Sequence, residues 1–177
     1  NASIISDICE AVDIPVEVGG GIRSEEAIET YLEAGVNRVI IGSKAVEDPD
    51  FMAAMAKKYG SMLAVSIDAK EDVVATRGWV DGSDKHVLPF AQSMLDLGIN
   101  TLIYTDISRD GMLTGPNFTM LGQLQQLPYI RLIASGGMSS IDDLKKLKAM
   151  GIYGAITGKA LYEGKITMAE IRSLGGM

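Results

Sequence analysis

Two stretches of this chain repeat one another without a gap, and the repeat limits the folds that the chain can form. One stretch opens at Glu17 with Glu-Val-Gly-Gly-Gly, and the other opens at Ile133 with Ile-Ala-Ser-Gly-Gly. Each copy is typical of a strand, a glycine turn, a helix, a second strand and a second glycine turn. Glycine turns that open helices bind phosphate, so the repeat predicts two phosphate sites and a ligand with a phosphate at each end. Six residues recur 116 positions later, where Gly20, Gly21, Ser24, Gly35, Ile40 and Gly42 correspond to Gly136, Gly137, Ser140, Gly151, Ile156 and Gly158.

The composition excludes several classes of function. A net charge of −7 argues against nucleic-acid binding through a broad basic surface. Cys9 is the only cysteine and His86 the only histidine, which disfavours a disulfide, a zinc site and a Ser-His-Asp triad. No apolar run is long enough to span a membrane. We therefore expect a cytoplasmic protein whose chemistry uses carboxylates and hydroxyls.

Short β-branched runs alternate with helical patterns along the whole chain. Gly35, Gly98 and Gly151 each follow a helical pattern, as glycines that end helices do. Strands that are apolar on both faces and joined by helices indicate a parallel sheet. The expected strands cover residues 16–18, 38–41, 62–67, 101–105, 131–134 and 153–157.

The length of the repeat favours a barrel over an open sheet. Six β-α units are two fewer than in the eight-stranded (β/α)8 TIM barrel, which typically needs about 250 residues. The offset of 116 residues spans four units, or half of such a barrel. The copy at 15–46 then fits strands three and four, and the copy at 131–162 fits strands seven and eight. We expect residues 1–177 to form a single domain, an incomplete barrel of strands three to eight with strands one and two absent. A doubly wound open sheet is the alternative.

Glycine turns after the strands are the candidate phosphate sites. In the first copy Gly19-Gly20-Gly21 with Ser24, and in the second Gly136-Gly137 with Ser139 and Ser140, are expected to leave their backbone amides open to a phosphate. Ordinary turn chemistry is the alternative, since glycine is common in such loops. Four glycine clusters at repeat-related positions favour phosphate binding. The first predicted site contains Gly20, Gly21, Gly42 and Ser43, and the second contains Gly136, Gly137, Gly158 and Lys159.

Two strands end in residues suited to acid–base chemistry. Asp68 ends an apolar strand, where barrel enzymes place catalytic groups, and can act as a general acid or base. A helix cap or a salt bridge with Lys70 is the alternative. Thr105 and Asp106 end the next strand, and spacing does not decide which of them faces the ligand. A threonine hydroxyl there can hydrogen-bond a reacting oxygen or orient Asp68.

Trp79 is the only tryptophan and lies in the long loop expected after the strand that ends at Asp68. An aromatic ring beside an active site can stack on a planar heterocycle, and packing on a neighbouring helix is the alternative. His86 stands at the start of the next helix and is expected at the surface.

Taken together, these segments resemble the ProFAR isomerases of histidine biosynthesis, over the whole chain. The matching motifs begin at Val16 (Val-Glu-Val-Gly-Gly-Gly-Ile-Arg), Ile41 (Ile-Gly-Ser-Lys-Ala-Val), Ser66 (Ser-Ile-Asp-Ala), Tyr104 (Tyr-Thr-Asp-Ile-Ser-Arg-Asp-Gly) and Ala134 (Ala-Ser-Gly-Gly). The resemblance implies an Amadori rearrangement, in which an aminoaldose with two phosphates opens and becomes an aminoketose. It adds Arg23 to the substrate-binding residues. It also implies that Trp79 covers the imidazole of the substrate. It further implies a reaction on a small molecule without a metal or organic cofactor.

The cyclase subunit of imidazole glycerol phosphate synthase has the same half-barrel repeat and is the nearest alternative. The run Ile-Thr-Gly-Lys-Ala-Leu-Tyr-Glu-Gly from Ile156, and Gly78-Trp79, resemble the isomerase instead. An isomerase that also acts on phosphoribosylanthranilate, and a phosphate-binding piece without catalysis, are further alternatives.

The resemblance also assigns catalytic roles. Asp68 becomes the general acid that protonates the ring oxygen and opens the ribose, and Thr105 hydrogen-bonds near the reacting carbons. The general base of the family is an aspartate at the end of strand one, and no residue of this chain corresponds to it. We therefore expect the 177-residue chain to be inactive by itself. We also expect it to self-associate through the exposed edges of strands three and eight.

Overall fold

The computed structural model describes residues 2–76 and 81–175, and it contains one strongly curved parallel sheet. Neighbouring strands follow one another in the order β1-β2-β3-β6-β7-β8, and every pair along this path is parallel. The order never reverses along the sheet, whereas that of a doubly wound sheet does. The strands are therefore an arc of a (β/α) barrel. Their bounds are β1 (Glu17–Gly19), β2 (Arg38–Ile41), β3 (Leu63–Lys70), β6 (Thr101–Asp106), β7 (Arg131–Ser135) and β8 (Gly154–Ala155).

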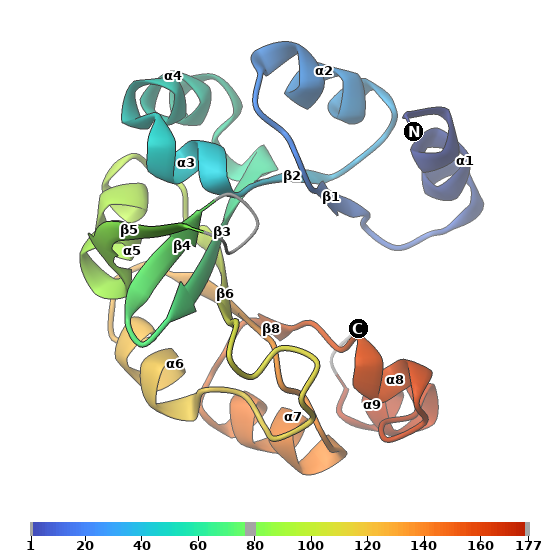
Figure 1. The fold of residues 1–177 in the computed structure, drawn as a ribbon. Helices are drawn as coiled ribbons and strands as arrows, with labels where there is room; N and C mark the ends of the chain where they lie inside the picture. The colour runs from blue at the N-terminus through green and yellow to red at the C-terminus, as the bar shows by residue number, and fades with distance from the viewer. Residues whose placement is uncertain (1, 77–80, 176–177) are drawn as a thin grey trace.

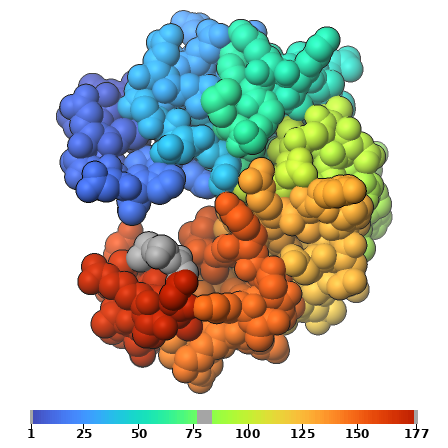
Figure 2. Space-filling model, turned by 180° about the vertical axis from the view of Figure 1, so that it is seen from behind, coloured from blue at the N-terminus to red at the C-terminus, as the bar shows by residue number. Residues whose placement is uncertain are grey.

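The helices lie along the convex side of this arc, and α1 and α9 flank its open side (Figure 1). Seen from the opposite side, the N-terminal and C-terminal segments are separated at the surface (Figure 2). None of the helices in the described ranges is long and apolar enough to cross a membrane. The helices are α1 (Ala2–Ala11), α2 (Glu25–Glu33), α3 (Ser43–Glu47), α4 (Pro49–Tyr59), the 3₁₀ turn η1 (Gly60–Met62), α5 (Val87–Asp96), α6 (Phe118–Leu124), α7 (Ile141–Ala149), α8 (Lys159–Tyr162) and α9 (Met168–Ser173).

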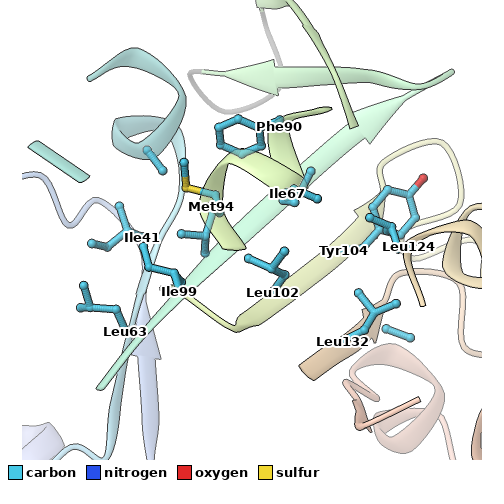
Figure 3. Close-up of a cluster of buried hydrophobic side chains, with 14 of the residues drawn as sticks. Ile41, Leu63, Ile67, Phe90, Met94, Ile99, Leu102, Tyr104, Leu124 and Leu132 are labelled. Atoms are coloured by element: carbon cyan, nitrogen blue, oxygen red, sulfur yellow. The ribbon is translucent and has the colours of Figure 1, made fainter. Parts of the chain in front are cut away.

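The main core lies between the sheet and the helices. Side chains alternate along a strand, so one set of strand residues faces outward and meets the helices (Figure 3). Full burial of one such aliphatic side chain contributes roughly 1.5–3 kcal/mol. A second, smaller apolar cluster joins Ala64, Ile103 and Ile133 on the concave face, with Ile40 packed against it. Outward-facing core residues include Ile41, Leu63, Ile67, Leu102 and Leu132, which are packed with Phe90, Met94 and Leu124 from the helices.

The expected strands are all present, but the segment after Asp68 differs from the prediction. β3 continues to Lys70, and Glu71 and Asp72 turn the chain back with φ of 50° and 69°. The chain then forms an antiparallel hairpin of β4 (Val73–Thr76) and β5 (Asp81–His86), where the sequence predicted a long loop. The last strand is also shorter than predicted, with β8 limited to two residues.

Candidate active site

The carboxyl ends of the strands surround a cavity of about 380 Å³ on the concave face. All six strands of the parallel path contribute to its wall, either directly or through the turn that follows. This is the end of a barrel where enzymes of this architecture bind their substrates. Seven residues selected from the sequence line it, namely Gly20, Gly21, Arg23, Gly42, Ser43, Asp68 and Thr105.

A second cavity of about 100 Å³ lies beside the first. It is lined by Gly111 and Leu113 from the loop after β6 and by the turns that follow β7 and β8. Ser135 and Ile156 belong to the walls of both cavities, so the two spaces are neighbours. The second cavity contains the other four residues predicted to bind phosphate, which are Gly136, Gly137, Gly158 and Lys159.

The two glycine turns have the same backbone geometry. Gly21 has φ of 67° and Gly137 has φ of 82°, in the left-handed region that residues with a side chain rarely adopt. Gly42 and Gly158 share a φ of −102° where they precede α3 and α8. Repeat-related positions therefore present similar backbone surfaces to the two cavities.

The amides of Ser139 and Ser140 are not open to a ligand, contrary to the sequence prediction. Both backbone N–H groups donate to Oδ2 of Asp143, at 2.8 and 3.3 Å, and so does the Ser139 hydroxyl, at 2.6 Å. The carboxylate of Asp143 thus satisfies the N-terminus of α7 from within the helix, as N-terminal carboxylates often do. In the first copy, the Ser24 hydroxyl accepts from the Ala27 amide at 3.2 Å. The backbone amides of the glycines that precede these serines, Gly20 and Gly21 in the first copy and Gly136 and Gly137 in the second, remain the candidates for binding phosphate.

A row of polar side chains crosses the middle of the larger cavity. Asp68 on β3 is paired in register with Thr105 on β6, and Thr105 with Ser135 on β7. Residues paired in this way face the same side of a sheet. Ser66 lines the same cavity, and its hydroxyl donates to Oδ1 of Asp68 at 2.9 Å. A carboxyl group and three hydroxyls therefore converge where a ligand bound in this cavity would lie.

The structure also decides between Thr105 and Asp106. Thr105 lines the cavity, whereas Asp106 is buried and organises the loop that follows. Its carboxylate accepts from the Ser108 amide at 3.0 Å and from the Asn117 side chain at 2.8 Å. Burial alone raises the pKa of Asp106, but the hydrogen bonds from Ser108 and Asn117 outweigh burial and hold the pKa below its ordinary value. Asp106 is a structural anion of the loop.

Charged side chains at the rim are held by neighbours. The Arg23 guanidinium forms an ion pair with Glu47 at the end of α3. Lys44 lines the larger cavity and pairs with Asp48 at 2.8 Å. Lys159, at the smaller cavity, donates to the Gly111 carbonyl at 3.0 Å and so joins the turn after β8 to the loop after β6. Positive charge therefore borders both cavities.

Several predicted and unpredicted residues complete the account. Trp79 lies outside the described residues. His86 is at the surface, as predicted, with its side chain 61% exposed and Nδ1 3.2 Å from Asp72. Sequence reasoning missed Ser66, Ser135 and Ile156 as lining residues. The signal for Ser66 was its position two residues before Asp68, which places both on one face of a strand.

Comparisons with known proteins identify the family of this chain. Residues 1–167 match the model of a family described as "Histidine biosynthesis protein". The chain is 53% identical to a protein of Listeria innocua and 46% identical to one of Oceanobacillus iheyensis, each over 171 residues that cover 97% of this chain and 71% of the relative. A Bacillus cereus protein is 52% identical over 97% of this chain and 72% of its own length. All three are named 1-(5-phosphoribosyl)-5-((5-phosphoribosylamino)methylideneamino) imidazole-4-carboxamide isomerase. This chain therefore belongs to the histidine biosynthesis protein family.

Proposed function

We propose that this protein is an isomerase of histidine biosynthesis that acts on ProFAR, the bis-phosphorylated compound in the names of its relatives. One observation carries the proposal, which is the pair of neighbouring cavities bordered by repeat-related glycine turns. Each turn can hold one phosphate, and the row of Asp68, Thr105 and Ser135 crosses the larger cavity and ends at Ser135 in the wall that the two cavities share. A compound with two phosphoribosyl groups has the two anionic ends that this pair of turns would hold. The protein is expected in the cytoplasm.

In the proposed reaction, Asp68 supplies the acid. Its carboxyl protonates the ring oxygen of the ribosylamine, which opens the ring and leaves an imine. Removal of the C2 proton then gives an enolamine, which rearranges to the aminoketose. Thr105 is next to Asp68 across the strand pair and donates a hydrogen bond near the reacting carbons.

The proposal includes a finer assignment of the strands. We assign β1, β2, β3, β6, β7 and β8 to the third to eighth strands of an eight-stranded barrel, with the general base on a first strand. Among the described residues, β1 pairs with β2 alone and β8 with β7 alone. Ile4 on α1, the helix that flanks the open side (Figure 1), is 60% exposed, and Ile14 between α1 and β1 is 62% exposed. We propose that a chain limited to residues 1–177 self-associates through these surfaces, which sedimentation at several concentrations tests directly. A single species of 18.9 kDa at all concentrations contradicts it.

The test of the activity uses the protein with whatever residues its gene encodes outside 1–177. Turnover of ProFAR to the ribulosyl isomer is expected, followed by absorbance or chromatography. Asp68→Asn keeps the shape of the side chain and is expected to lower kcat at least about 100-fold, because the acid is lost. Unchanged turnover by Asp68→Asn removes this residue from the mechanism. Turnover that requires ammonia and releases an imidazole product identifies a cyclase instead.

A further inference from the structure

Ser66 is a side chain of the larger cavity with no role in the reaction described above. It lies on the concave face of β3, two residues before Asp68, and its Oγ is 2.9 Å from Oδ1 of Asp68. β3 is paired on both sides, with β2 along its first half and with β6 from Ala64 to Ala69. The backbone that carries both side chains is therefore held by the ladder with β6, in a strand that is also paired with β2 just before Ser66. The contact between them is built into the centre of the sheet.

We propose that Ser66 is a positioning residue that sets the orientation of the Asp68 carboxyl group for proton transfer. The inference rests on the proposed function, because it concerns the acid of that reaction. A serine hydroxyl has one proton to donate, and here it goes to Oδ1. Oδ1 is thereby held on the side of Ser66, and the hydrogen bond limits rotation of the carboxyl group within the cavity.

A purely structural role for Ser66 makes different predictions. Ser66 is paired in register with Ile103, next to the small apolar cluster of the concave face, and a small side chain is needed there for packing alone. Ser66→Ala satisfies that need and removes only the hydroxyl. If size is all that matters, this variant retains full activity. If the hydroxyl orients Asp68, the variant loses turnover but not substrate binding.

A double-mutant cycle separates the two roles. Ser66→Ala is expected to lower kcat about 10- to 100-fold, the range for a lost hydrogen bond to a charged group, because negative charge develops on the Asp68 carboxylate as its proton leaves; KM is expected to change by less than about threefold. In the Asp68→Asn background the same substitution is expected to have no further effect on kcat, because the group that it orients is already disabled. Ser93→Ala is the matched control. Its hydroxyl also makes one hydrogen bond, to the Phe90 carbonyl at 2.7 Å, but on α5 at the outside of the sheet. Equal kcat for Ser66→Ala and Ser93→Ala overturns the proposal. The proposal is also overturned if Ser66→Ala lowers kcat by the same factor in the Asp68→Asn background as in the unsubstituted protein.

A crystal structure of Ser66→Ala gives a readout that needs no turnover. The Asp68 carboxyl group is expected to occupy more than one side-chain conformation in the variant and a single one in the unsubstituted protein. A single, unmoved conformation in both overturns the proposal even if the protein has another activity. If the unsubstituted protein does not turn over ProFAR, the proposed function is overturned. The side-chain conformations of Asp68 in the two crystal structures still decide whether Ser66 orients its carboxyl group.

Discussion

Gly21 and Gly137 occupy the same place in the two repeats, yet replacement of each by alanine has very different consequences. Both have positive φ, so an alanine at either position is strained by about 1–2 kcal/mol. A Cβ added at Gly21 meets no atom within 4 Å among the described residues. A Cβ added at Gly137 lies 2.5 Å from the carbonyl oxygen of Gly115 and 3.1 Å from Cβ of Arg109. The Gly115 carbonyl has to retreat by nearly an ångström before the contact becomes ordinary.

That carbonyl is not free to retreat without loss. It accepts a hydrogen bond from Nη1 of Arg109 at 3.2 Å, and the Gly115 amide donates to the Gly137 carbonyl at 2.8 Å. Overpacking against backbone costs about 1–3 kcal/mol, and disruption of one of these hydrogen bonds adds roughly 0.5–1.5 kcal/mol. We therefore expect Gly137→Ala to lower the free energy of unfolding by about 2–4 kcal/mol more than Gly21→Ala does.

Urea denaturation followed by far-ultraviolet circular dichroism measures this difference, in buffer without phosphate so that ligand binding plays no part. Gly21→Ala serves as the internal control for the cost of positive φ. Equal loss of stability in the two variants, or a greater loss for Gly21→Ala, refutes the inference that the loop after β6 is seated on Gly137. It leaves the phosphate proposal untouched, since no ligand is present.

Three further predictions concern single side chains of the site. Thr105→Val keeps the shape of a buried side chain and removes its hydroxyl, and it is expected to lower kcat about tenfold while KM stays nearly constant, in steady-state kinetics with ProFAR. Lys159→Met removes the hydrogen bond to the Gly111 carbonyl and a positive charge from the smaller cavity. Titration calorimetry is therefore expected to show about tenfold weaker binding of a bis-phosphorylated ligand. Lys165 is exposed, and Lys165→Met is the control that is expected to leave the affinity unchanged. Folding lowers the pKa of the Asp106 carboxyl group below its ordinary value of 3.8. The ionised carboxylate therefore stabilises the folded state at pH values above 3.8, and this contribution to the free energy of unfolding is lost as the pH falls from 3.8 through the lowered pKa of the folded state. Unfolding measured from pH 7 to pH 3 is thus expected to show the stability gap between the unsubstituted protein and Asp106→Asn narrowing towards acid, and a constant gap contradicts this account.

The strands of the parallel path could be predicted because each is a short apolar run with its own turn signals. The hairpin after β3 could not. β5 contains Asp81, Gly82 and Ser83, which are common in turns, and it is a strand because β4 pairs with it rather than through propensity. Choosing Thr105 over Asp106 also needed the structure. Both positions end the same strand, and only the alternation of faces, fixed by the register with Ser135, shows which one meets the cavity.

The helix that follows the second glycine turn begins with a capping motif that can be recognised in the sequence. Ser140 and Asp143 have the spacing of a helix-capping pair, and that spacing already indicated that the amides of Ser139 and Ser140 have an internal partner. The Asp143 carboxylate competes with any ligand for these amides, which is why they are not open to a phosphate. The glycines before them, by contrast, were identified by the repeat alone. Recurrence at a fixed offset is informative because a turn required only for folding need not occur twice in the same context.

Ser135 and Ile156 form a wall common to both cavities, and this wall sets how far apart the two ends of a ligand must lie. A ligand that reaches both cavities has to pass these two residues, so the separation of its anionic ends is selected independently of the chemistry between them. If the two cavities hold phosphates as proposed, a compound with one phosphate lacks the second anchor that fixes its position relative to Asp68. Substitutions that enlarge or reduce the side chains of Ser135 or Ile156 are therefore expected to change which ligand length binds best, with a smaller effect on the reaction itself.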